Sequence, residues 1–276
     1  MSDDFVSAWI HGGIGNQLFQ IANAINYSDK TKKKLIFKND INLWNYHGLE
    51  RKTAWDTLFS GKLNVIKDDT YYNSIQFHEY KEQRDNMHDD IPYIEGNVYL
   101  RGYFQTHKYI NDVTRNKMND LVYSNNEYYT IAKMLYDIIK NYFKDNDDNN
   151  YVFLHMRRTD YVGNNTHNLL SFDYYKNALC HFNNNIKVVL FSDDIEWCKY
   201  HVNLENCYPV DIKNHYVELI LMSFYKNGII ANSTFSWWGA YLGNKDKRII
   251  APKQWYATTS HVKKWDDMYL NDWILI

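Results

Sequence analysis

The second half of the chain alternates short apolar segments with segments of helical periodicity, and this pattern limits the fold more than any other feature of the sequence. The apolar segments have the length of strands that are buried on both faces. The expected strands are 151–156, 187–191, 228–231 and 248–251, and the expected helices are 172–182, 195–202, 216–225 and 236–242. Such alternation builds a parallel sheet with helices on both faces, so this half predicts a Rossmann-like domain.

The first half begins with the same order of elements. A strand is expected at 5–10, and after a glycine-rich turn a helix is expected from about Gln17 to Ser28. At helical spacing, its buried face carries Leu18, Ile21, Ala22 and Ile25. Further strands are expected at 34–37 and 97–103, whereas the rest of 39–125 is irregular and gives no order of elements. We expect a second Rossmann-like domain here.

A helix and a polar segment separate the two halves. Residues 127–143 predict an amphipathic helix, whose apolar stripe is Ile131, Met134, Leu135, Ile138 and Ile139. Residues 144–150 are polar throughout, as in a linker. The expected domains are therefore 1–145 and 151–276.

The composition excludes several classes of protein. Hydrophobic residues make up 45% of the 276 residues and charged residues 23%, as in soluble globular proteins. The 31 Lys and Arg residues nearly balance the 33 Asp and Glu residues, so no basic excess favours a nucleic-acid partner. No apolar stretch approaches the ~20 residues that cross a bilayer, and no signal peptide is visible. We expect a cytoplasmic protein, with peripheral membrane contact left open.

The sequence offers no framework for a metal or for disulfides. The three cysteines, Cys180, Cys198 and Cys207, are odd in number and form no CxxC pair, which suits a reducing compartment. Asp145 and Asp147 form an Asp-x-Asp, but they belong to a charged run that follows a helix, which favours a solvated loop over a metal site. No metal and no cofactor are expected.

Two adjacent arginines follow the strand 151–156. Because strand side chains alternate, His155 and Arg157 share one side, and Met156 and Arg158 share the other. The carboxyl ends of strands in an open α/β sheet face the ligand crevice, where an arginine can grip a phosphate with two parallel hydrogen bonds. The alternative is an arginine pair that bridges surface carboxylates, of which Asp160 is the nearest.

A glycine-rich turn, 12–17, joins the first strand to the first helix. Its glycines allow positive φ and a close approach of a ligand to the backbone, and the helix start presents unpaired amides. It has neither the Gly-x-Gly-x-x-Gly order of dinucleotide binders nor the Gly-Lys-Ser/Thr of a P-loop. A tight turn in which Asn16 caps the helix explains the segment equally well.

Two further strand ends carry polar groups that suit a diphosphate ligand. Asp193 and Asp194 close the strand 187–191; one is expected to cap the next helix, which leaves the other to accept from a donor such as the amine edge of guanine. Ser233, Thr234 and Ser236 lie where a strand turns into a helix, and amides and dipole there favour an anion. A parallel sheet brings such ends to one edge.

Three segments together resemble the α-1,2-fucosyltransferases of glycosyltransferase family 11. They are 12–20 (Gly-Gly-Ile-Gly-Asn-Gln-Leu-Phe-Gln), 155–162 (His-Met-Arg-Arg-Thr-Asp-Tyr-Val) and 232–240 (Asn-Ser-Thr-Phe-Ser-Trp-Trp-Gly-Ala). They follow the family's order and extend from the first strand to the last helix. The His-x-Arg-Arg element also resembles that of the α-1,6- and protein O-fucosyltransferases, which implies a shared donor site.

The resemblance implies a metal-independent, inverting enzyme of GT-B type, an α/β fold in which two Rossmann-like domains face each other across a cleft. Domain 1–145 would be the acceptor side and domain 151–276 would bind the donor, GDP-β-L-fucose; the acceptor would be a terminal galactoside, joined by an α-1,2 linkage. Thr159 and Ile14 stand where the family usually has Gly and Leu. Another GDP- or UDP-linked deoxysugar therefore stays open as donor. A non-catalytic sugar- or nucleotide-binding module is the alternative of another class.

The resemblance also implies roles for donor-side residues. Arg157 would bind the β-phosphate and offset charge as GDP departs, with Arg158 beside it in the donor site. His155 and one of Asp193 or Asp194 would contact guanine or ribose. The phosphate-binding hydroxyl would be Ser236, in the same turn as Ser233 and Thr234.

On the acceptor side, the resemblance implies a loop that faces the reaction centre. Its residues are Gly13, Gly15, Asn16 and Gln17, of which Asn16 would be catalytic together with Arg157. Inversion normally needs a base near the acceptor hydroxyl. His11 and Asp40 are the candidates, and the departing phosphate could take the proton instead.

Overall fold

The computed structural model of the chain describes residues 3–40, 42–46, 49–124 and 126–276. The chain forms two compact α/β units, each built on a parallel sheet. The first comprises residues up to Asn125 together with Lys264–Leu270, and the second comprises Asn126–Lys263 with Asn271–Ile276. The division thus falls before the helix at 126–143, whereas the polar segment suggested a boundary after it.

The second unit contains a six-stranded parallel sheet, with all four expected strands in it. The strands are β9 (Tyr151–Met156), β10 (Lys187–Ser192), β11 (Cys207–Pro209), β12 (Asn227–Ile229), β13 (Arg248–Ala251) and β14 (Ile274–Leu275). Their order across the sheet is β11-β10-β9-β12-β13-β14, which is 3-2-1-4-5-6 when counted along the unit. This is the Rossmann order, and it reverses between β9 and β12. Strands β11 and β14 are too short to show a pattern in the sequence.

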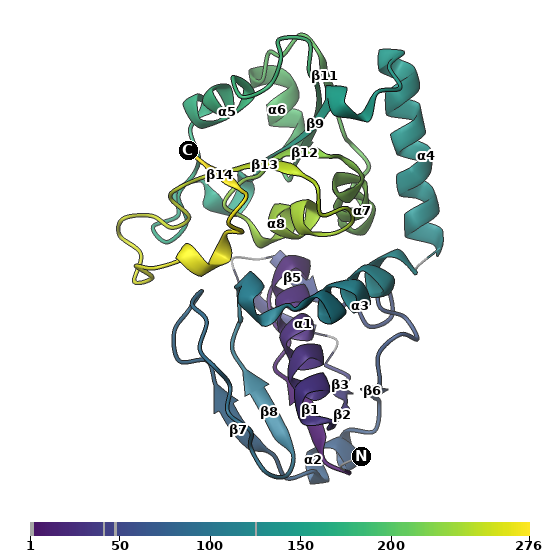
Figure 1. Cartoon of the computed structure of the whole chain (residues 1–276), viewed down its shortest axis with the longest axis vertical. Helices are drawn as coiled ribbons and strands as arrows, with labels where there is room; N and C mark the ends of the chain where they lie inside the picture. The colour runs from purple at the N-terminus through teal and green to yellow at the C-terminus, as the bar shows by residue number, and fades with distance from the viewer. Residues whose placement is uncertain (1–2, 41, 47–48, 125) are drawn as a thin grey trace. The chain divides into compact units, whose positions relative to one another are not determined.

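Helices cover both faces of this sheet (Figure 1). On one face lie α5 (Phe172–Leu179) and α6 (Ile195–His201), and on the other lie α7 (His215–Phe224) and α8 (Thr234–Tyr241). Alternate residues of β9, such as Leu154 and Met156, pack in one core with Ala178 of α5 and Cys198 of α6. This two-sided burial explains why all six residues of β9 are buried.

Helix α4 (Asn126–Phe143) also belongs to the second unit, but only part of its predicted apolar stripe is buried. Ile131, Met134 and Ile138 are exposed, and the helix packs on α7 with a face that carries Tyr136 and Ile139. The ring of Tyr136 lies against those of Phe224 and Tyr225, at centroid distances of 5.8 and 5.3 Å. The helix has apolar residues on two sides, and only its tertiary neighbour selects one.

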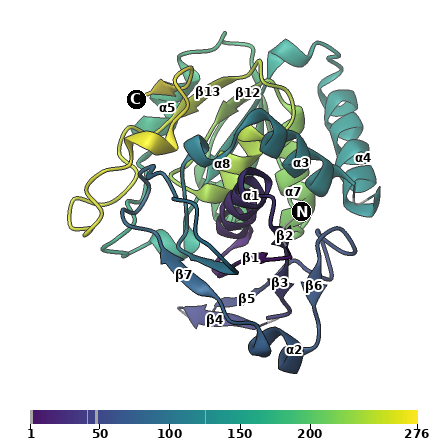
Figure 2. The ribbon, with the colours of Figure 1, turned by 60° about the horizontal axis from the view of Figure 1, so that its bottom comes forward.

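The first unit has a four-stranded parallel sheet in the order β2-β1-β8-β7. Helix α1 packs on the sheet and against α3 (Figure 2). The sheet strands are β1 (Phe5–Ala8), β2 (Lys34–Leu35), β7 (His78–Lys81) and β8 (Val98–Arg101). The helices are α1 (Ile14–Thr31), α2 (Asp69–Ser74) and α3 (Asp112–Tyr123). Smaller pairs are β3 (Phe37–Lys38) with β6 (Val65–Ile66), and β4 (Asn42–Tyr46) with β5 (Leu49–Lys52). The expected buried face of α1 is confirmed, since all four of its predicted apolar residues are buried.

A late segment of the chain completes the first unit. It contains the 3₁₀ helix η4 (Asp266–Met268), which contacts η1 (His107–Tyr109). Asp267 pairs with Lys108 at 2.5 Å, and its backbone oxygen accepts a 2.6 Å hydrogen bond from Thr106. Two further 3₁₀ turns, η2 (Asp148–Asn150) and η3 (Thr159–Tyr161), belong to the second unit. Among the helices that the structure describes, none is both long and apolar enough to cross a membrane.

Candidate active site

The polar residues that follow β9, β10 and β12 lie at one edge of the second sheet. Arg157, just after β9, is mostly buried and forms ion pairs with Asp160 at 2.7 Å and with Asp193 at 3.0 Å. Its guanidinium also lies over the ring of Tyr161, 5.5 Å from the centroid. The pair with Asp160 is the contact that the packing interpretation of the arginines predicted. A guanidinium carries five N–H donors, however, so two carboxylate contacts leave donors for a further anion.

Arg158 points to the opposite side of the sheet, as the strand alternation predicted. Its guanidinium stacks on Trp197 of α6, 3.2 Å from the ring centroid, and its Nε pairs with Asp194 at 3.3 Å. Met156 lies on the same side, with its sulfur 4.0 Å from that of Cys198. Sequence reasoning missed Trp197. Its signal is an aromatic residue at the start of the helix that follows the acidic pair.

The two aspartates hold the arginines in place, and the expected helix cap is wrong. Asp194 occupies the N-cap position of α6 but makes no side-chain capping bond. Asp193 accepts hydrogen bonds from the backbone N–H of Arg158, at 2.8 Å, and from the hydroxyl of Thr159. Each carboxylate also pairs with a guanidinium, whose full charge attracts it more strongly than the partial charges of the first amides of α6. Arg157, Asp160 and Asp193 thus form one network of three charged side chains.

His155 is buried on the face of β9 opposite to Met156, and its ring centroid lies 5.5 Å from that of Phe235. Its Nδ1 has no hydrogen-bond partner among the described residues. Burial, and then the charge of Arg157, lower the pKa of His155 against the opposing effect of Asp193, so the ring is neutral near pH 7. A neutral imidazole can both donate to and accept from a ligand.

A second residue that sequence reasoning missed is Glu218, on α7. Burial, followed by the charges of Asp193 and Asp211, raises its pKa to about 7. It is the single acidic residue in a helix that is otherwise mostly apolar, which was a usable signal. A half-buried carboxylate beside the Asp193 network fits a site that binds polar ligand groups.

In the turn from β12 into α8, the backbone N–H groups are better suited to bind an anion than the side-chain hydroxyls are. Ser233, at the N-cap, is buried and makes no side-chain capping bond, and Thr234 is partly exposed. Ser236, the hydroxyl expected to bind phosphate, is fully buried, and its Oγ lies 3.3 Å from the backbone oxygen of Ser233. Ser233 and Ser236 are three residues apart, and both face inward at the start of α8. The amides of the first turn of α8 remain the better anion donors.

These residues surround the point where the strand order of the second sheet reverses. Arg157 follows β9 and Ser233 follows β12, which are neighbours in the sheet, and Asp193 follows β10 on the other side of β9. In open α/β sheets, ligands bind outside the carboxyl ends of the strands at this switch point. A fixed guanidinium, a neutral imidazole and a helix N-terminus there suit a phosphorylated ligand that carries polar rings.

In the first unit, the predicted loop follows β1. Gly13, which has no side chain, is the N-cap of α1, so Asn16 is not at the capping position that the tight-turn alternative assumed. Instead, the Oδ1 of Asn16 accepts a 3.0 Å hydrogen bond from Gln105. Gly15 is buried in the first turn of α1. Gln17 is buried and donates to the backbone oxygens of Gly12 and Lys52, at 3.1 and 2.9 Å, so it braces this loop.

The two candidate bases differ in their surroundings. His11 lies near the carboxyl end of β1, stacked on Trp9 at a centroid distance of 4.6 Å, and partial burial lowers its pKa. Asp40 follows β3; its side chain is 58% exposed, and it lies 3.3 Å from the ammonium of Lys38. His11 therefore shares an edge of the main sheet with Asn16, whereas Asp40 does not.

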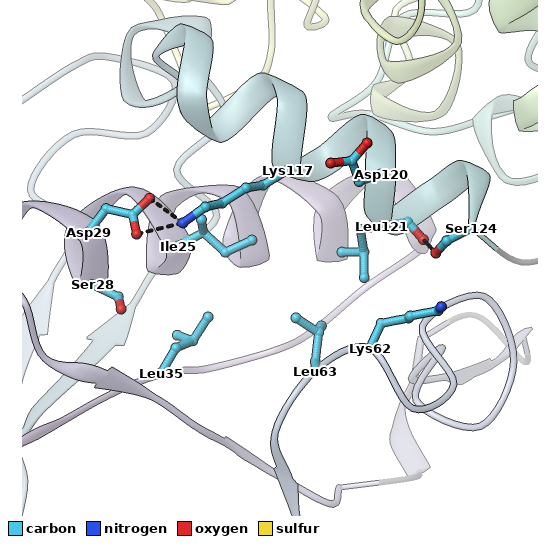
Figure 3. A pocket seen from close by; sticks show the side chains of 10 residues that line it. All are labelled: Ile25, Ser28, Asp29, Leu35, Lys62, Leu63, Lys117, Asp120, Leu121 and Ser124. Atoms are coloured by element: carbon cyan, nitrogen blue, oxygen red, sulfur yellow. Dashed lines mark hydrogen bonds and ion pairs between the residues drawn. The ribbon is translucent and has the colours of Figure 1, made fainter.

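A cavity of about 470 Å³ opens elsewhere in the first unit (Figure 3). Apolar side chains such as Ile25, Leu35 and Leu121 line it, and the ion pair between Asp29 and Lys117 crosses its edge. It contains none of the predicted site residues. Among the residues that the structure describes, no group of three or more His, Cys, Asp or Glu side chains could hold a metal ion.

Comparison with known proteins gives consistent relatives. The family model of glycosyl transferase family 11 matches residues 58–276. An Escherichia coli protein named alpha-1,2-colitosyltransferase is 30% identical over 91% of this chain and 92% of its own length. The O-antigen biosynthesis glycosyltransferase WbnK of the same species is 27% identical over 95% of this chain and 98% of its own.

The fold comparison agrees. The NodZ alpha-1,6-fucosyltransferase, in a crystal soaked with GDP-fucose, superposes with a TM-score of 0.56 at 14% identity, over 91% of this chain and 96% of that one. Two α/β units with parallel sheets and this likeness identify a fold of GT-B type. The family model covers well over half of the chain, so the protein is a glycosyltransferase that belongs to glycosyl transferase family 11.

Proposed function

We propose that the protein transfers L-fucose from GDP-β-L-fucose to the 2-hydroxyl of a terminal galactoside, with inversion at the anomeric carbon. The observation that carries this proposal is the set of polar groups at the switch point of the second sheet, where Arg157 and the start of α8 follow neighbouring strands. The superposition on a structure soaked with GDP-fucose supports the same choice of donor.

The arginine suits the leaving group. Breakage of the anomeric bond builds negative charge on the diphosphate and positive character on the sugar ring. A cation that is already fixed in place stabilises that charge without reorganisation, an effect of about 3–4 kcal/mol for one well-placed donor. Asp160 and Asp193 fix the plane of the Arg157 guanidinium, and its remaining N–H groups would bind the β-phosphate. The amides of α8 would bind a second phosphate oxygen.

The nucleoside would be held by His155 and by the carboxylates near it. Asp193 and Asp194 are already bound to the arginines, so either would have to share its oxygens with guanine or ribose. Glu218 makes no such pair with any residue that the structure describes, so it is the better acceptor for the amino edge of guanine or for ribose hydroxyls. We therefore expect GDP binding to weaken more when Glu218 loses its carboxylate than when Asp193 or Asp194 loses the oxygen that an arginine does not occupy.

A second donor has a specific observation in its favour. The relative that is 30% identical is named for α-1,2 transfer of colitose, so a GDP-linked colitose is the alternative donor for the same site and the same linkage. The base that removes the acceptor proton is not fixed by either choice. We favour His11 over Asp40, because it lies near Asn16 and its ring is neutral near pH 7.

The experiment is a transfer assay with GDP-fucose, GDP-colitose and UDP-linked deoxysugars as donors and lactose-like disaccharides as acceptors. NMR of the product identifies the linkage. Turnover with GDP-fucose to an α-1,2 product supports the proposal, and selective turnover with GDP-colitose supports the alternative. If GDP raises the melting temperature but no donor is consumed, the protein binds nucleotides without catalysis.

A further inference from the structure

A half-buried glutamate with one fully buried carboxylate oxygen lies at the carboxyl edge of the first sheet, outside every site described so far. Glu82 follows β7, and its Oε2 accepts hydrogen bonds from the backbone N–H groups of Tyr103 and Phe104, at 2.7 and 3.0 Å. Its Oε1 is buried and has no hydrogen-bond partner among the described residues. The two amides belong to the turn that follows β8, so one side chain ties two neighbouring strand ends together.

The turn is shaped around this carboxylate. Phe104 has a φ of 51°, a left-handed conformation that costs a non-glycine residue free energy and orients two successive N–H groups toward one anion. At Gly102, a Cβ atom would lie 2.4 Å from the Cβ of Glu82, so only glycine fits there. The left-handed conformation of Phe104 and the missing side chain of Gly102 let the backbone of this turn lie closer to Glu82 than in an ordinary turn.

The next residue connects this turn to the predicted catalytic loop. Gln105 is buried and donates a 3.0 Å hydrogen bond from Nε2 to the Oδ1 of Asn16. The ring of Tyr103 packs against that of Trp9, with centroids 5.5 Å apart. Strands β1 and β8 are adjacent in the first sheet, so the residues that follow them lie at the same edge.

We propose that Glu82 is a positioning residue, which fixes the turn 102–105 so that Gln105 orients the side chain of Asn16 toward the acceptor sugar. This inference rests on the proposed function, in which Asn16 serves the acceptor side. It predicts that the carboxylate affects acceptor binding and not nucleotide binding, because its contacts lie wholly in the first unit.

The hold of Glu82 on the turn 102–105 depends on pH. Burial, opposed by the two amides and reinforced by Asp85 and Asp89, raises the pKa of Glu82 to about 7; Tyr80, Tyr103 and Tyr109 are the other titratable groups that it influences. A raised pKa means that the buried position favours the protonated acid. Its stabilising contribution is complete below the ordinary value of 4.5 and is lost as the pH rises through 7.

The test uses three variants of the full chain: Glu82→Ala, Glu82→Gln and, as matched control, Glu79→Ala. Glu79 lies on β7, three residues before Glu82, is 47% exposed and forms a surface ion pair with Arg101 at 2.8 Å. We expect Glu82→Ala to speed amide exchange at Tyr103 and Phe104 and to raise the acceptor KM about tenfold, with the GDP Kd unchanged. Glu82→Gln keeps a carbonyl acceptor, so it should retain the wild-type KM at pH 6.

The pH profile adds a readout that a merely structural role would not move. The wild-type acceptor KM should rise between pH 6 and 8.5, and that of Glu82→Gln should stay flat, because the amide has no proton to lose. If Glu82→Ala does not fold, this comparison carries the test alone.

Two results would overturn the inference. Unchanged amide exchange in Glu82→Ala means that the carboxylate does not hold the turn. Faster exchange with an unchanged acceptor KM, or with an equal rise in GDP Kd, means that the turn does not position Asn16 for the acceptor. Absence of transfer by the wild type refutes the proposed function instead. The amide-exchange experiment then still decides whether Glu82 holds the turn.

Discussion

Replacement of Arg157 by lysine separates an arginine that binds a diphosphate from one that only joins carboxylates. The guanidinium contacts Asp160 at 2.7 Å and Asp193 at 3.0 Å, and the three side chains are only about one-fifth exposed, at 18, 22 and 18%. One ammonium cannot span both carboxylates, so one charged hydrogen bond is lost, which costs about 1.5–3 kcal/mol of stability. Both interpretations of the arginine predict this loss.

Nucleotide affinity distinguishes the two interpretations. If the free N–H groups of Arg157 bind phosphate oxygens in parallel, lysine removes the paired grip and raises the GDP Kd about 10- to 100-fold. Turnover should fall further, about 100- to 1,000-fold, because the lost donor faces charge that develops in the transition state. Titration calorimetry with GDP and initial rates with the donor measure these two quantities.

The matched control is Arg248→Lys. Arg248 is exposed at the start of β13, at the amino edge of the same sheet, where its guanidinium lies 5.3 Å from the ring centroid of Phe182. We expect near wild-type affinity and turnover from this variant. Should Arg157→Lys lose stability but keep its GDP Kd within about twofold, the guanidinium is an internal salt link and the proposed donor site is wrong.

Three further predictions concern the fold, pH and metals. Gly228→Ala should destabilise the protein by about 1–3 kcal/mol in urea unfolding, because the new Cβ would lie 2.3 Å from the ring of Phe153; unchanged stability would contradict the close packing. The raised pKa of Glu218 means that ionising its carboxyl group costs the folded protein free energy. Glu218→Gln should therefore gain stability relative to the wild type as the pH rises from 4.5 through 7, by up to about 3 kcal/mol; parallel stability curves of the two proteins would rule this out. Transfer should continue at the same rate in EDTA, and recovery of a lost rate by Mn²⁺ would overturn metal independence.

Some features of the candidate site could be predicted from the sequence, because strand periodicity is local. The burial of β9 and the opposite directions of Met156 and His155 follow from a two-residue repeat, and the structure confirms both. The position of the arginines at a strand end follows from the same repeat. The partners of these arginines do not. Asp193 lies 35 residues from the backbone N–H of Arg158 that it binds, and no local pattern encodes that contact.

The same distinction explains where the structure departs from the sequence pattern. Ser236 is expected to bind phosphate, but tertiary packing buries it together with Ser233, three residues before it on the same side of the helix start. Helix α4 carries apolar residues on two sides, and contact with α7 determines which side is buried. Glu82 gave no signal at all, since its importance depends on a turn about twenty residues later.

The sequence by itself determined the alternation of strands and helices, the parallel sheet of the second unit and the chemistry available at its strand ends. The order of the strands, and with it the switch point where β9 meets β12, emerges only when the chain has folded. Folding also decided which charges neutralise one another and which carboxylates are buried. The reason is physical: periodicity depends on neighbours within a few residues, whereas desolvation and ion pairing depend on chain segments that meet only after folding.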